Sequence, residues 1–160
     1  MAKLTNGDNM RLSDYLTIDR TIILKSDTKS GALDELIDAQ IESLEGISRE
    51  KLADAINTRE ALMSTGIGLG IAVPHVRMEG VSEAFVTVGI SRMGVRDFES
   101  IDGEPVRIIV LIVAPLGRHD LYIKLLATVV NRLKEAAVRS GIIEAKTPDQ
   151  IYTVLTGDMK

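Results

Sequence analysis

The sequence contains no cysteine. That absence excludes disulfide bonds, thiolate metal sites and cysteine nucleophiles together, and it fits a reducing compartment. Long hydrophobic runs are also missing, since the longest one, residues 108–116, has nine residues whereas a membrane-spanning helix needs about 20. The opening residues, MAKLTNGDNM, lack the apolar core of a signal peptide. We therefore expect a cytoplasmic protein with no direct membrane insertion.

Neither sign of charge dominates the chain. It has 19 basic and 23 acidic residues, a net charge of −4 and no long run of either sign, so a broad nucleic-acid surface is not expected. A chain of 160 residues with 45% hydrophobic residues has the size and composition of one globular domain. We expect residues 1–10 to form a flexible leader and residues 11–157 to form the domain.

Helical and strand-like patterns alternate along the chain. Apolar residues at helical spacing follow Ser30 and extend to Leu44, and Ser48 is placed to cap a second helix that reaches Arg59. A long amphipathic helix follows Pro115, and a last one begins at Thr147-Pro148. The pattern also indicates a helical turn at 11–16 and strands at 21–24, 84–91 and 105–114. This alternation predicts a single α/β domain.

Only two histidines are available for chemistry, His75 and His119. His119 comes just before a helix, where an exposed polar residue is ordinary. His75 follows Gly66, Gly68 and Gly70, a stretch in which backbone amides can converge on an anion.

Three interpretations of this glycine run compete. A dinucleotide-binding turn needs a strand before it and a helix after it, but here the order is reversed. A structural loop with incidental glycines is the second interpretation. The third is a phosphate cradle that delivers a phosphoryl group to neutral His75, with charge from Arg59 and hydrogen bonds from Ser64, Thr65 and the amides around Gly66 and Gly68. Thr65, Gly66 and Gly68 fall within four consecutive positions, 65–68.

Other kinds of site lack a pattern in this sequence. Two histidines and scattered carboxylates show no metal-ligand spacing, and there is no G-x-S-x-G nucleophile elbow. We therefore expect neither a metal nor a cofactor.

The residues around His75 resemble the signature of a known family. The resemblance rests on residues 58–60 (TRE), 64–68 (STGIG), 70–75 (GIAVPH) and 101–106 (IDGEPV). These resemble the fructose/mannitol-type enzyme IIA domains of the bacterial phosphoenolpyruvate-dependent phosphotransferase system, which include nitrogen-regulatory homologues. The similarity runs from Leu12 to about Leu155.

The resemblance implies a site, a fold and partners. His75 matches the histidine that accepts a phosphoryl group on Nε2 from the phosphocarrier HPr, and Arg59 matches an arginine beside it. The implied fold is a mixed sheet of about five strands flanked by helices on both faces. The next acceptor is a separate IIB protein. The alternatives are a regulatory protein whose phosphorylation state controls partner binding, and a non-catalytic interaction module on the same fold.

Two positions depart from the family pattern. Tyr122 stands where the family has a second active-site histidine, and His119 lies three residues earlier, about one helical turn away. Leu69 stands where many members have asparagine. We expect Tyr122 to donate one hydrogen bond to the phosphoryl group, with His119 as the alternative partner.

Overall fold

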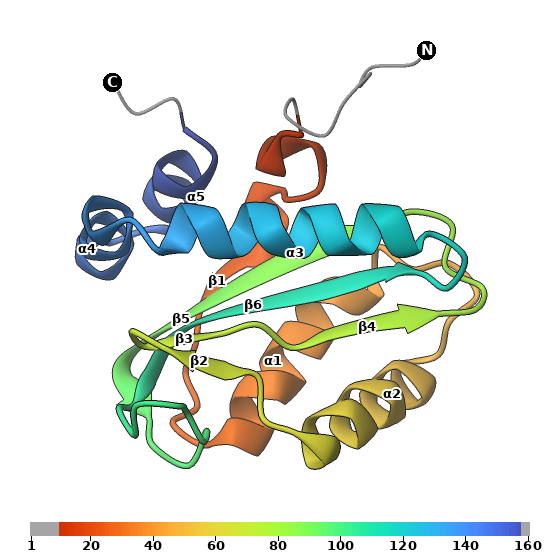
Figure 1. Cartoon of the computed structure of the whole chain (residues 1–160), viewed down its shortest axis with the longest axis horizontal. Coiled ribbons are helices and arrows are strands. Elements are labelled where there is room, and N and C mark those ends of the chain that lie inside the picture. The colour runs from red at the N-terminus through yellow and green to blue at the C-terminus, as the bar shows by residue number, and fades with distance from the viewer. Residues whose placement is uncertain (1–9, 158–160) are drawn as a thin grey trace.

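The computed structural model describes residues 10–157. A sheet forms the middle layer, with α1 and α2 on one face and α3, α4 and α5 on the other (Figure 1). The strands are β1 (Thr21–Ile23), β2 (Gly66–Gly68), β3 (Ile71–Ala72), β4 (His75–Met78), β5 (Phe85–Val95) and β6 (Val106–Pro115). The helices are α1 (Lys29–Ile41), α2 (Arg49–Leu62), α3 (His119–Leu133), α4 (Ala136–Glu144) and α5 (Pro148–Thr156), with short 3-10 turns η2 (Leu12–Asp14) and η3 (Ile18–Arg20).

The sheet is mixed, as expected, and has six strands where about five were expected. Its order is β1-β5-β6-β3-β2, and β4 also pairs with β6. The difference comes from the glycine run, which folds into the short antiparallel strands β2 and β3. β3 and β4 follow one another along the same edge of β6, both parallel to it. The expectation of one α/β domain with helices on both faces is confirmed.

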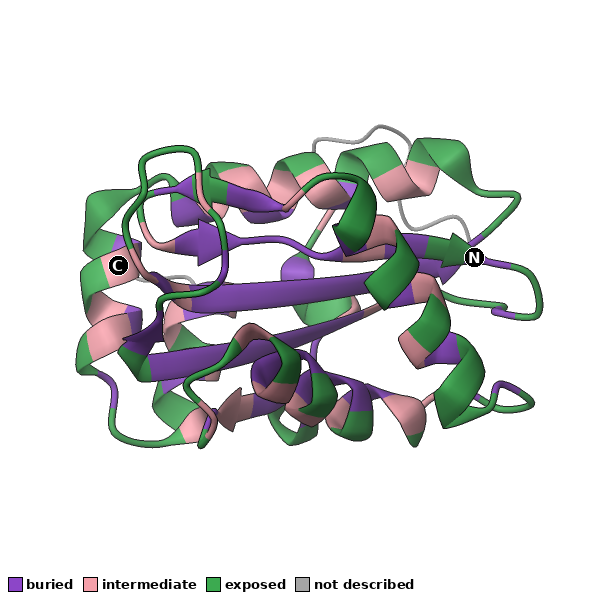
Figure 2. Cartoon of the chain, turned by 90° about the horizontal axis from the view of Figure 1, so that it is seen from below, coloured by how far each residue is buried: buried purple, intermediate pink, exposed green. Residues whose placement is uncertain are grey.

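β6 divides the hydrophobic core into two clusters. Side chains of a strand alternate between its faces, so Ile108, Val110 and Ile112 join the cluster under α3, α4 and α5. Their neighbours Ile109, Leu111 and Val113 join the cluster under α1 and α2. Figure 2 shows the sheet strands as a buried layer between partly exposed helices. The nearly continuous apolar sequence of β6 is therefore explained by burial on both faces.

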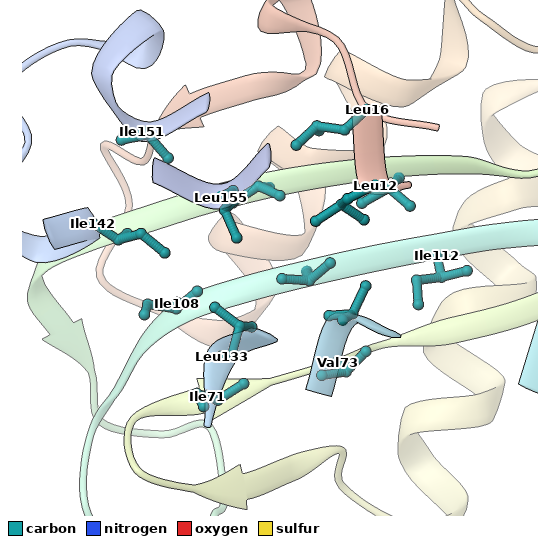
Figure 3. Packing of buried hydrophobic residues seen from close by; sticks show 14 of the residues in the cluster. Leu12, Leu16, Ile71, Val73, Ile108, Ile112, Leu133, Ile142, Ile151 and Leu155 are labelled. Atoms are coloured by element: carbon teal, nitrogen blue, oxygen red, sulfur yellow. The ribbon is translucent and has the colours of Figure 1, made fainter. Parts of the chain in front are cut away.

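The α3-side cluster gathers segments that are distant in the sequence. Figure 3 shows Leu12 and Leu16 from the start of the domain beside Leu155 of α5, with Leu133 of α3 over the sheet residue Ile71. Met10 also packs against this cluster, although it was expected to belong to the flexible leader. Residues 1–9, the rest of the expected leader, lie outside the described residues.

Polar residues begin the helices that the sequence indicated. The hydroxyl of Ser48 accepts the amide of Lys51 at 3.1 Å. The hydroxyl of Thr147 accepts the amide of Gln150 at 3.2 Å. These two caps were predicted and are confirmed, and each satisfies an amide that has no partner within its own helix.

Two features of the helices differ from expectation. α1 is capped by Thr28, begins at Lys29 and ends at Ile41, so the buried Leu44 lies beyond the helix rather than within it. α4 was not expected as a separate helix, and its buried residues Val138 and Ile142 pack in the α3-side cluster. Among residues 10–157, no helix combines the length and the apolar character that crossing a membrane requires.

Candidate functional site

His75 is the first residue of β4 and faces α3. Val76 and Met78 of the same strand point into the cluster under α1 and α2. Because side chains alternate along a strand, His75 and Arg77 project from the opposite face. His75 pairs with Ile112 of β6, so the central strand of the sheet sets its position. Its side chain is half-buried at the end of the α3-side cluster.

The backbone holds the imidazole of His75 in one tautomer. Its Nδ1 lies 2.6 Å from the carbonyl oxygen of Val73. A carbonyl oxygen can only accept a hydrogen bond, so Nδ1 carries the proton. In the neutral ring the lone pair is then on Nε2. The arrangement presents Nε2 as the nucleophilic atom.

The surroundings of His75 also favour the neutral ring. Burial lowers the pKa of His75 below its ordinary value, and the positive charge of Arg59 lowers it further. The hydrogen bond to Val73 and the negative charge of Glu60 act in the opposite direction but do not cancel the effect of burial. An imidazole with a lowered pKa remains unprotonated at neutral pH, as a nucleophile must.

Tyr122, on the first turn of α3, is the aromatic neighbour of His75. The two ring centroids are 5.4 Å apart and the planes are inclined by 49°. The ring of His119 lies 6.4 Å from that of Tyr122, and within residues 10–157 no ring contact joins His119 to His75. Of the two candidates for a second site residue, the structure brings Tyr122 beside His75 and places His119 one ring further away.

The phenol of Tyr122 stays protonated at neutral pH. Burial raises the pKa of Tyr122 above its ordinary value, although the positive charges of Arg59 and Arg77 act to lower it. A protonated phenol can donate one hydrogen bond and carries no charge. Tyr122 therefore offers a hydrogen-bond donor but no positive charge.

Arg59 lies in the last turn of α2 and acts on the site through its charge. Its Nη1 donates a hydrogen bond to the carbonyl oxygen of Met63 at 3.1 Å, which helps to end the helix. The positive charge of the same guanidinium contributes to the lowered pKa of His75 and acts against the burial that raises the pKa of Tyr122. Because a guanidinium has five N–H donors, the bond to Met63 leaves others for an anion.

The remaining predicted site residues lie just before β2 (Ser64 and Thr65) or in it (Gly66 and Gly68), and they take part in hydrogen bonds within the chain. Ser64 Oγ donates to the carbonyl oxygen of Glu99 at 2.6 Å and accepts the Gly66 amide at 3.3 Å. The Gly68 amide donates to Ser100 Oγ at 3.0 Å. Thr65 is buried and bonded to Glu60. A phosphate-binding role for Ser64, Thr65, Gly66 and Gly68 stays a prediction.

A chain of contacts that was not anticipated from the sequence connects α1 to His75, and its middle members Glu60, Thr65 and Val73 are buried. Lys29 Nζ lies 3.0 Å from a carboxylate oxygen of Glu60, and Glu60 accepts both the amide and the hydroxyl of Thr65. The Thr65 carbonyl accepts the Val73 amide at 3.1 Å. Val73 in turn holds Nδ1 of His75. The signal for Glu60 was a carboxylate on the apolar side of α2, near the buried Ile56.

Leu69 occupies an unusual backbone conformation. Its φ is +60°, between Gly68 at +92° and Gly70 at +76°. Glycine adopts this left-handed region freely and asparagine tolerates it, whereas a residue such as leucine is strained there. The Leu69 amide donates to the carboxylate of Asp102 at 3.0 Å, which anchors the turn. The conformation explains why asparagine suits this position better than leucine does.

Comparison with known proteins assigns the chain to a family. The family model described as "Phosphoenolpyruvate-dependent sugar phosphotransferase system, EIIA 2" matches residues 15–157. The chain belongs to this EIIA 2 family. Proteins of the family are phosphotransfer components, which agrees with a neutral histidine whose Nε2 is free. The resemblance found in the sequence is thereby confirmed.

Relatives of the EIIA 2 chain include sugar-specific and regulatory proteins. It is 31% identical to the fructose-specific EIIABC component of Bacillus subtilis over 148 residues, which are 91% of this chain and 23% of that protein. It is 30% identical to a nitrogen regulatory protein of Bradyrhizobium diazoefficiens over 132 residues, 82% of this chain and 85% of the relative. The chain thus spans about a quarter of the first relative and most of the second.

Solved structures share the fold of the EIIA 2 chain. The nitrogen regulatory protein IIA-Ntr of Neisseria meningitidis superposes with a TM-score of 0.83 at 23% identity, covering 91% of this chain and 99% of that one. The complex of enzyme IIAMTL and phosphorylated enzyme IIBMTL from Escherichia coli gives a TM-score of 0.67 at 24% identity, covering 85% and 94%. At these identities the likeness shows the fold alone.

Proposed function

We propose that this chain is a phosphoryl carrier, which accepts a phosphoryl group on Nε2 of His75 from an HPr-like phosphocarrier and passes it to a separate IIB protein. The observation that carries the proposal is the hydrogen bond from Nδ1 of His75 to the Val73 carbonyl. It fixes the tautomer whose Nε2 lone pair is free. The lowered pKa of His75 supports the same role.

The acceptance step uses groups that the fold places around His75. The Nε2 lone pair attacks phosphorus, a nitrogen–phosphorus bond forms, and the bond from phosphorus to the donor breaks with its electron pair returning to the donor. In-line transfer needs hydrogen bonds and positive charge around the equatorial oxygens. The Arg59 guanidinium and the Tyr122 phenol supply these groups in the proposal, because both belong to the surroundings of His75.

The same hydrogen bond favours onward transfer. The Val73 carbonyl can accept but not donate, so Nδ1 keeps its proton after Nε2 has formed the bond to phosphorus. A phosphorylated ring that retains this proton carries positive charge and is a good leaving group. When the next acceptor attacks phosphorus, the bonding pair returns to Nε2 and neutral His75 is restored. The family relative solved as a complex with phosphorylated IIBMTL supports a IIB protein as that acceptor.

A regulatory role is the second candidate. The relatives that match most of their own length include nitrogen regulatory proteins. In this role His75 is phosphorylated in the same way, but the phosphorylated and unphosphorylated chains differ in their binding to another protein. The two roles share the acceptance step and differ in the fate of the phosphoryl group.

The test reconstitutes the pathway with the whole chain. Phosphoenolpyruvate, enzyme I and HPr are mixed with the chain, and candidate IIB proteins are then added. We expect one acid-labile, base-stable phosphate on the parent chain and none on His75→Ala, which should still fold because a half-buried strand-edge residue adds little to the core. Arg59→Lys keeps the charge but loses the fork, and should slow acceptance about tenfold.

Each outcome of this test has a distinct meaning. Transfer to a IIB protein supports the carrier role, whereas uptake with no transfer to any IIB protein supports the regulatory role. No uptake at all contradicts both and supports an interaction module. Full phosphorylation of His75→Ala overturns the assignment of His75.

A further inference from the structure

Arg77 shares a strand face with His75. It lies two positions later on β4, and the burial pattern of the strand places both side chains on the face toward α3. Side chains two positions apart on a strand start about 6.6 Å from each other. Arg77 pairs with Ala114 of β6 through its backbone, so its starting point is as firmly set by the sheet as that of His75.

The side chain of Arg77 turns toward the aromatic neighbour of His75. Its Cζ lies 5.2 Å from the ring centroid of Tyr122, within the range of a cation–π contact. Its Nη1 also donates to the carbonyl oxygen of Leu116 at 3.3 Å. These two contacts hold the guanidinium beside Tyr122 and leave further N–H groups for an anion.

Two guanidinium charges therefore act at Tyr122. Arg59 and Arg77 both act to lower the pKa of Tyr122, and the Tyr122 ring lies 5.4 Å from that of His75. The two arginines come from different elements, the end of α2 and the middle of β4. Of the two arginines, only Arg59 is among the causes of the lowered pKa of His75. The charge of Arg77 thus acts at the aromatic neighbour of His75.

The charge of a phosphoryl group requires more than one cation. Phosphorylated side chains carry about −1.5 to −2 charges at neutral pH; against these, the proposed site so far holds the positive ring of phospho-His75 and the permanent positive charge of Arg59. The carboxylate of Glu60 adds negative charge near His75, and Tyr122 is neutral. We propose that Arg77 is a further residue of the phosphoryl site, supplying a second permanent positive charge to the group on His75 while its stacking holds Tyr122 in place. This inference rests on the proposed function.

The phosphoryl equilibrium between HPr and the chain tests this role. A docking residue changes how fast that equilibrium is reached, whereas a residue that stabilises the phosphorylated form changes its position. Radiolabelled phospho-HPr is mixed with the full chain, and the two phosphorylated proteins are separated and counted at equilibrium. Arg77→Gln removes the charge, Arg77→Lys keeps it, and Arg96→Gln makes the same charge change at an exposed residue beyond the end of β5.

The expected result is a shift of the equilibrium toward phospho-HPr by about two- to fivefold for Arg77→Gln, the upper part of the range typical of an exposed charge interaction. Arg77→Lys should shift the equilibrium less than Arg77→Gln does, because lysine keeps the charge although it loses the planar group stacked on Tyr122. Arg96→Gln should match the parent. An Arg77→Gln equilibrium equal to that of Arg96→Gln overturns the inference, even if the approach to equilibrium is slower. If Arg77→Lys shifts the equilibrium toward phospho-HPr as far as Arg77→Gln does, the charge of Arg77 does not stabilise the phosphoryl group and the inference is also overturned.

A second phosphoryl donor separates this inference from the proposed function. Phosphoramidate is a small donor that needs no docking surface. If the parent chain accepts phosphate from phosphoramidate but not from HPr, the proposed donor is wrong. Arg77 is then tested by the lifetime of phospho-His75, which should shorten by about two- to fivefold in Arg77→Gln. An unchanged lifetime overturns the inference. A parent chain that accepts phosphate from neither donor overturns both proposals.

Discussion

Replacing Glu60 with glutamine tests whether a buried carboxylate supports the segment that carries His75. The Glu60 side chain is 4% exposed, and its partner Lys29 is 22% exposed. Glu60 accepts two hydrogen bonds from Thr65, and the Thr65 carbonyl accepts the Val73 amide. Glutamine keeps the volume but loses the charge and one of the acceptor oxygens.

The structure sets the size of the effect. A hydrogen bond to a charged group contributes about 1.5–3 kcal/mol, and removing one partner of a fully buried ion pair costs about 3–5 kcal/mol. Lys29 is partly exposed, so water can solvate its ammonium group once Glu60 is neutral. The loss of unfolding free energy should therefore be smaller than the cost of breaking a fully buried ion pair. We expect Glu60→Gln to lower the free energy of unfolding by about 2–3 kcal/mol.

The assay is urea unfolding followed by far-ultraviolet circular dichroism. Glu83→Gln is the matched control, since Glu83 is an exposed loop residue and its change should stay within about 0.5 kcal/mol of the parent. A double-mutant cycle with Thr65→Val should show coupling of about 1 kcal/mol or more, as residues in one network usually do. If the free energies of unfolding of Glu60→Gln and Glu83→Gln agree within about 0.5 kcal/mol, the Glu60 carboxylate does not support this segment.

Three further results are expected. Gly66→Ala should lower the free energy of unfolding by about 1–3 kcal/mol, because a Cβ at Gly66 would collide with the backbone oxygen of Glu99, whereas Gly117→Ala has no atom within 4 Å and should be near neutral; equal losses would contradict this. Tyr122→Phe should slow phosphoryl transfer about ten- to a hundredfold and His119→Ala should match the parent, with the reverse order implicating His119. NMR titration of His75 should give a pKa below its ordinary value, because burial disfavours the charged ring. The folded chain then binds fewer protons than the unfolded chain, so His75 lowers stability as the pH falls through the ordinary imidazole pKa; a pKa at or above that value contradicts the burial argument.

Local signals in the sequence predicted the helices with polar caps. Ser48 and Thr147 were identified because a hydroxyl before an apolar-periodic segment has a specific partner, an unpaired helix amide. At the start of α5, the Gln150 side chain also accepts the Lys146 amide at 2.7 Å. No side-chain hydrogen bond caps the start of α4, and no local sequence pattern marked where this helix begins. The end of α1 was also missed, because Leu44 stays buried after the helix has ended.

Strands that depend on distant partners were harder to predict. The long apolar sequence of β6 indicates a central strand by itself, whereas β3 and β4 exist because each pairs with β6 more than 30 residues later in the chain. With two and four residues, they are too short to carry a periodicity that identifies a strand. Pairing between distant segments is a property of the whole fold, and composition alone does not encode it locally.

The candidate site also contains residues that local sequence signals predicted and one, Arg77, that depends on knowing the strand. The sequence singled out His75, Arg59 and Tyr122. The structure places the rings of His75 and Tyr122 5.4 Å apart, and the charge of Arg59 acts on both. Arg77 was passed over because an arginine after a strand residue is ordinary on a solvent-facing surface. The available signal was its spacing of two from His75, which puts both on one strand face. That signal becomes meaningful only once 75–78 is known to be a strand.

The central claim is that Nε2 of His75 carries the phosphoryl group while Nδ1 keeps its proton. The most direct measurement is NMR of the chain labelled with nitrogen-15 in its histidines, recorded before and after phosphorylation by phosphoenolpyruvate, enzyme I and HPr. The account predicts phosphorus bonded to Nε2 of His75 and a proton on Nδ1, held by the Val73 carbonyl. Phosphorus on Nδ1 of His75, on His119 or on a hydroxyl group would contradict it.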